Sequence, residues 1–121
     1  MNDSIDILSF CRVLTDLTQK GKCKWMQTPH NSRDRLDFET GYVEITQYQE
    51  NDKRKKCYVL DFYDNNDSPF VPIFAEKGVE ADAEAYKVFG DLYKSIWAYY
   101  EKIRNEKIAS FYEEIMCKTT K

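Results

Sequence analysis

The chain has 121 residues and a formal net charge of −3, and hydrophobic residues make up 42% of it and aromatic residues 15%. This is the length of one domain, and this much apolar material supports a folded core and excludes wholesale disorder. The near balance of acidic and basic residues gives no general attraction to nucleic acids or to anionic membranes.

Neither a secretory signal nor a membrane span is expected from the sequence. The segment from Met1 to Asp6 has no basic and no apolar region, and no uncharged apolar run approaches the roughly 18 residues that span a bilayer. We therefore expect a cytoplasmic protein. The four cysteines form no C-x-x-C pair and there is a single histidine, so we expect reduced, mostly buried thiols and no bound metal.

The first predicted element is an amphipathic helix over residues 4–20. Ser4 or Asp3 is its expected N-cap, and Gly21 is its expected C-terminal stop. The helical spacing of the apolar residues carries this prediction. These residues are Ile7, Phe10, Leu14 and Leu17.

A run of short strands is predicted next. Residues 22–26 alternate polar and apolar side chains, which predicts a strand with Cys23 and Trp25 facing inward. Residues 28–34 have the composition of a loop.

The alternation that resumes at Leu36 and Phe38 slips by one residue after Gly41. Such a slip would turn the apolar face of a continuous strand toward water. Residues 39–41 therefore form either a hairpin turn or a glycine bulge, and we prefer the hairpin.

The central part of the chain alternates strands with turns. Residues 49–56 are a charged turn, and residues 57–63 are the most strand-like segment. Residues 64–69 are a turn, and residues 70–74 are a last strand that Pro72 confines to the edge of the sheet. On the segment 57–63, one face carries Tyr58, Leu60 and Phe62.

The last third of the chain predicts a helix that is longer than the domain. From Val79 to Cys117 there is no proline, and apolar residues recur at helical spacing. Unbroken, the segment would be about 58 Å long. A compact domain of this length is roughly 35 Å across.

Two alternatives follow for the end of this helix. The apolar spacing jumps between Ile103 and Ile108, and Asn105 tolerates a helix end, so a break near residue 105 is one of them. Residues 106–117 would then form a separate short helix. In the other, the helix stays straight and its far end meets a partner chain.

The order of elements predicts an α+β fold: an N-terminal helix, an antiparallel meander of four or five short strands, and a long C-terminal helix. Both helices would cover the apolar face of the sheet. We expect one domain over residues 1–121, with residues 106–121 as a protruding or partner-contacting segment.

Chemical motifs give little support to catalysis. No glycine-rich phosphate loop, metalloprotease motif or nucleophile elbow is present, so no cofactor and no catalytic or metal-ligating residue is assigned. A minimal nuclease built around His30, with Arg33 or Arg35 as the cation and Asp34 or Lys24 as the partner, is an alternative that no spacing requires.

The basic run over residues 53–56 offers a further alternative. It would hold a small phosphorylated or nucleotide ligand, with tyrosine stacking from Tyr48 and Tyr58. Glu50 and Asp52 lie directly before the run and the whole chain is acidic, so we do not expect nucleic-acid binding.

The leading hypothesis is a non-enzymatic interaction protein that self-associates as a dimer. The long helix is apolar over a wider arc than one small sheet can cover, and aromatic side chains favour interfaces. The candidate interface residues are Tyr93, Trp97, Tyr100, Phe111, Tyr112 and Ile115. The candidate charged rim is Arg54, Lys55 and Lys56.

Overall fold

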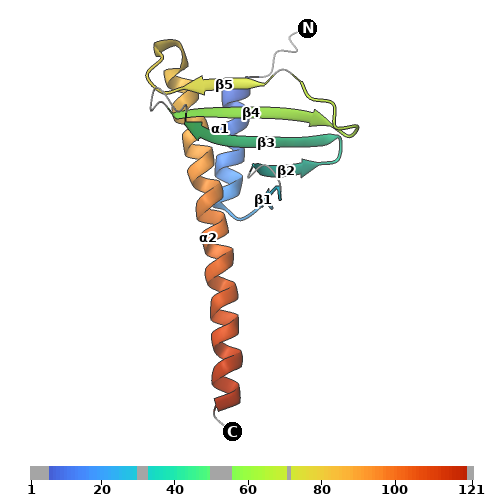
Figure 1. Cartoon of the computed structure of the whole chain (residues 1–121), viewed down its shortest axis with the longest axis vertical. Coiled ribbons are helices and arrows are strands. Elements are labelled where there is room, and N and C mark those ends of the chain that lie inside the picture. The colour runs from blue at the N-terminus through green and yellow to red at the C-terminus, as the bar shows by residue number, and fades with distance from the viewer. Residues whose placement is uncertain (1–5, 30–32, 50–55, 71, 120–121) are drawn as a thin grey trace.

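The computed structural model describes residues 6–29, 33–49, 56–70 and 72–119. It confirms the predicted α+β class, with an N-terminal helix, a five-stranded antiparallel sheet and a long C-terminal helix (Figure 1). The elements in chain order are α1 (Ile7–Gln19), β1 (Met26–Gln27), β2 (Asp34–Phe38), β3 (Gly41–Gln49), β4 (Lys56–Asp64), β5 (Ile73–Glu76), the 3-10 turn η1 (Glu80–Asp82) and α2 (Ala83–Thr119). The strands follow one another in the sheet in the order β1-β2-β3-β4-β5.

Helix α1 begins and ends on local signals. Its N-cap is Asp6, whose carboxylate accepts a hydrogen bond from the Leu8 N–H at 3.0 Å, whereas the predicted caps lie outside the described residues. At the other end Gly21 has a φ of 73°, and the Lys22 N–H donates to the Leu17 carbonyl at 2.9 Å. This is the Schellman arrangement, so the predicted glycine stop is confirmed.

The core lies between the two helices and one face of the sheet. Arg12 of α1 contacts Glu84 at 2.7 Å, and Gln19 donates to Ser95 at 3.4 Å, so α1 and α2 run side by side in the same direction. Alternate strand residues face the helices, as the period of a β-strand requires. The most deeply buried apolar side chains come from both helices and the sheet, and they include Cys11, Val43, Ile45, Leu60, Phe89, Leu92 and Ile96.

The first strand was predicted in the wrong place. Residues 22–25 form no strand, and β1 is the two-residue segment Met26–Gln27, which pairs with β2. Cys23 and Trp25 are nevertheless buried as expected, and the Trp25 indole N–H donates to Thr18 Oγ1 at 2.9 Å. The hydrogen bond that satisfies the buried indole comes from α1 and not from a strand.

The β2–β3 connection is the hairpin that we preferred. Phe38 is paired with Gly41, which leaves Glu39 and Thr40 as the turn. A side chain at Gly41 would overlap the backbone carbonyl oxygen of Tyr63 on β4, so glycine is required at this close approach.

The remaining strands shift by a few residues from their predicted positions. Asp34, expected in a loop, is the first residue of β2. The last strand covers residues 73–76 and not 70–74, and it lies at a sheet edge as predicted. In the predicted charged turn, residues 50–55 lie outside the described part of the chain.

Helix α2 continues through Asn105 without a break over its 37 residues. At 1.5 Å per residue it is about 55 Å long. The break near residue 105 that the sequence allowed is therefore absent, and the second half of the helix extends well past the sheet and α1 (Figure 1). Within the described residues, neither helix has a stretch apolar enough to span a bilayer.

Candidate protein-interaction surface

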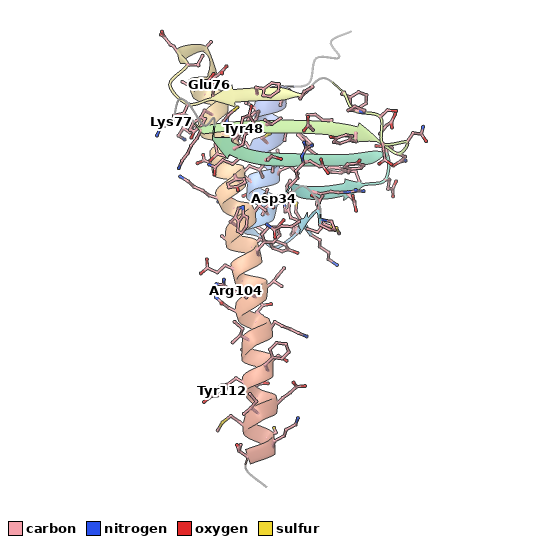
Figure 2. The ribbon with its side chains drawn as sticks, in the orientation of Figure 1. Asp34, Tyr48, Glu76, Lys77, Arg104 and Tyr112 are labelled. Carbon is pink, nitrogen blue, oxygen red and sulfur yellow. The ribbon has the colours of Figure 1, made fainter. Side chains whose placement is uncertain are left out.

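Helix α2 has two halves that differ in burial. The first half packs against α1 and the sheet through Val88, Phe89, Leu92 and Ile96. In the second half, every residue from 101 to 119 is exposed. Figure 2 shows Arg104 and Tyr112 on this part of the helix, beyond the sheet that carries Asp34. We call residues 101–119 the distal helix.

One face of the distal helix is apolar. The distal stripe consists of Ile108, Phe111, Tyr112 and Ile115, whose spacing of +3, +1 and +3 places them on a single helical face. Their exposed fractions lie between 50% and 64%. The Lys107 ammonium lies 5.3 Å from the centre of the Phe111 ring. Large side chains gathered on one exposed face are typical of an interaction site.

An aromatic ladder connects the distal helix to the sheet. The Tyr58 ring of β4 lies 5.0 Å from the Tyr86 ring and 5.4 Å from the Tyr93 ring, both on α2. Tyr93 is followed by Trp97 at 6.2 Å, and Trp97 by Tyr100 at 5.4 Å, edge to face. Tyr93 and Tyr100 are thus half-buried within their own chain, whereas Trp97 remains 43% exposed.

A buried carboxylate holds the base of the distal helix. Asp34 of β2 is 1% exposed, and its Oδ1 accepts a hydrogen bond from the Tyr100 hydroxyl at 2.9 Å. Burial raises the pKa of Asp34 to about 6, although hydrogen bonding from Tyr100 and Trp97 opposes the rise. Burial and the neighbouring Asp34 also raise the pKa of Tyr100. This contact fixes the point at which α2 leaves the sheet.

An open groove lies in the corner between β1 and α2. Its volume is about 770 Å³. Met26 and Gln27 line one side, and Tyr100, Ile103 and Phe111 are among the residues that line the other. Because β1 is an edge strand, the groove opens at an edge of the sheet. The groove adjoins the distal stripe, because Phe111 belongs to both.

A second polar cluster lies on the sheet face that α1 and α2 leave uncovered. Glu44 and Asp61 are directly opposite each other on β3 and β4, and each is 7% exposed. Arg33 Nη1 lies 3.2 Å from Glu44 and 3.3 Å from Asp61, and it donates to the Tyr63 hydroxyl oxygen at 3.2 Å. Burial raises the pKa of Asp61, with Arg33 opposing the rise. One guanidinium therefore compensates two buried carboxylates.

Arg33 and Arg35 are the candidate cations of the nuclease alternative, and both pair with carboxylates of the fold. Arg33 is held by two carboxylates, and Arg35 contacts Asp37 at 2.6 Å and lies 3.6 Å above the centre of the Tyr42 ring. Both candidate cations are thus engaged in the fold. His30 lies outside the described residues. Within the described residues, no group of three histidine, cysteine or carboxylate side chains could hold a metal ion.

Lys56, the one residue of the predicted charged rim within the described part of the chain, does not border the distal stripe. Lys56 begins β4 and lines a separate hollow with Tyr86 and Lys87, near the start of α2. Arg54 and Lys55 lie outside the described residues. The structure brings Trp97, Phe111, Tyr112 and Ile115 to one side of α2.

Sequence reasoning missed Asp34, Glu44 and Asp61 as buried groups. Glu44 and Asp61 alternate with the apolar residues of their strands, and they lie buried on the sheet face away from the helices. Their burial depends on Arg33 and Tyr63, to which no local pattern points. Asp34 lay in a predicted loop, and its partner Tyr100 is 66 residues away.

No family model, curated protein or solved structure matches this chain.

Proposed function

We propose that this protein is a non-enzymatic, cytoplasmic interaction module that binds another protein chain through the distal stripe. The observation that carries the proposal is the exposure of every residue from 101 to 119 on a helix with an apolar face. Helices in proteins owe most of their stability to the packing of such a face. A partner would supply the missing packing.

The chemistry of the stripe supports protein binding over small-molecule binding. An amphipathic helix presents its anchors at i, i+3, i+4 and i+7, which is the spacing of Ile108, Phe111, Tyr112 and Ile115. Phenylalanine and tyrosine bring large contact areas at low entropic cost. Charged residues on the rest of the distal helix would form a polar rim around such a contact.

Photo-crosslinking at two positions on α2 tests this proposal. A benzophenone side chain replaces either Phe111, on the distal stripe, or Glu113, which lies two residues on and so on the far side of the helix. In an extract of the cells that make the protein, we expect polypeptide adducts from position 111 at least about tenfold more often than from position 113. Equal yields at both positions, or none at either, would contradict the proposal.

A further inference from the structure

We infer that the chain bound by the distal stripe is a second copy of this protein, whose α2 packs against the first in antiparallel orientation. The inference rests on the proposed function and names the partner. Three features of the distal helix support it: the period of its exposed face, the placement of its charges, and its length relative to the groove beside β1.

The exposed face has the period of a two-stranded coiled coil. Alternating steps of three and four residues give the average repeat of 3.5 that keeps two helices in contact. We define the distal seam as the residues on these steps, all of them exposed. They are Glu101, Arg104, Ile108, Phe111, Ile115 and Lys118.

The charges of the distal seam favour an antiparallel pair over a parallel one. In a parallel dimer each seam residue faces its own copy, so Glu101, Arg104 and Lys118 would each meet a like charge. In an antiparallel pair with Ile108 opposite Phe111, reversal of the chain direction places Glu101 opposite Lys118, and Arg104 meets Ile115 and not a like charge. The pair of Glu101 and Lys118 then occurs twice, because the two copies are related by a two-fold axis.

A second pair of charges flanks the seam. Lys107 and Glu114 are one heptad apart and lie on the same side of it. Flanking residues on this side face each other in an antiparallel pair. Lys107 of one copy would thus meet Glu114 of the other, again twice per dimer. A parallel pair would instead place Lys107 beside Tyr112.

The length of the distal helix fits this arrangement. Nineteen residues, 101 to 119, extend about 28 Å. With Ile108 opposite Phe111, Thr119 of the second copy comes beside Tyr100, at the groove of about 770 Å³ below β1. Each helix end would lie at the mouth of the other copy's groove, beside Met26, which is 53% exposed.

Charge reversal tests both the partner and the orientation. The variants are Lys107→Glu, Glu114→Lys and the two together, with Lys102→Glu on the far side of the helix as the control. Association is measured by sedimentation equilibrium at low salt. Each single reversal introduces two like-charge contacts per dimer, so we expect dissociation constants about tenfold higher, and values within about threefold of the unaltered protein for the double variant.

Failure of this inference can be told from failure of the proposed function. An unaltered protein that stays monomeric at about 100 µM, or a double variant as weak as the single ones, would overturn the second copy or its orientation. Adducts at position 111 that contain another polypeptide would still support the proposed function. The control Lys102→Glu is expected to associate like the unaltered protein, and a tenfold loss there would show that net charge, not pairing, is responsible.

Discussion

Replacement of Phe111 by aspartate is expected to abolish self-association in the concentration range where the unaltered protein dimerises. An aromatic anchor at the centre of an interface contributes about 2 kcal/mol or more, and a symmetric dimer contains two copies of it. A loss of about 4 kcal/mol corresponds to a dissociation constant about a thousand times higher. Sedimentation velocity over a concentration series measures this change.

The fold of the monomer is expected to tolerate Phe111→Asp, because Phe111 is 50% exposed and lies outside the core. At concentrations where both proteins are monomeric, urea unfolding should differ by less than about 0.5 kcal/mol. Ala109→Asp is the matched control, since it places the same side chain on the exposed helix away from the distal seam. Equal loss of association in both variants would contradict the assignment of the interface to this face.

The contribution of Asp34 to stability is expected to fall as the pH rises from 4 to 6, because this carboxyl group is buried. Its pKa is raised from 3.8 to about 6, so the folded protein keeps this proton over a range in which the unfolded chain has released it. Stability decreases with pH wherever the unfolded state binds fewer protons. The difference between the two pKa values corresponds to roughly 3 kcal/mol at pH 7.

The variant Asp34→Asn isolates this contribution. Asparagine keeps an oxygen that can accept the hydrogen bond from Tyr100 but does not titrate. We expect the free energy of unfolding of the variant to lack the component of the pH dependence between 4 and 6 that Asp34 supplies, as measured by urea denaturation at a series of pH values. Parallel curves for the variant and the unaltered protein over this range would show that Asp34 is not responsible.

Local patterns were sufficient to predict the fold class. Periods of 3.6 and 2 residues identified α1, α2 and the strand over residues 57–63, and the out-of-phase apolar residues around Gly41 identified the hairpin. These features depend on residues close together in the sequence. The distal stripe was predictable for the same reason, since Phe111, Tyr112 and Ile115 share a helical face whatever the helix contacts.

The errors arose where the structure depends on contacts between separate elements. Trp25 is buried outside any strand, and its indole N–H donates to Thr18 of α1, so its alternating neighbours were misleading. Asp34 enters a strand because Ile45 pairs with it and Tyr100 covers it. Arg33 lies outside the strands, as its loop assignment predicted, but its contacts with carboxylates on β3 and β4 were not foreseen. Period and composition do not encode these contacts.

Hydrogen–deuterium exchange of the unaltered protein at two concentrations tests most directly whether a second copy covers the distal stripe. Between about 2 µM and about 200 µM, we expect the amides of residues 101–119 to exchange more slowly as the dimer forms, while those around Phe89 and Leu92 in the core stay unchanged. Exchange of residues 101–119 at the same rate at both concentrations would contradict the dimer.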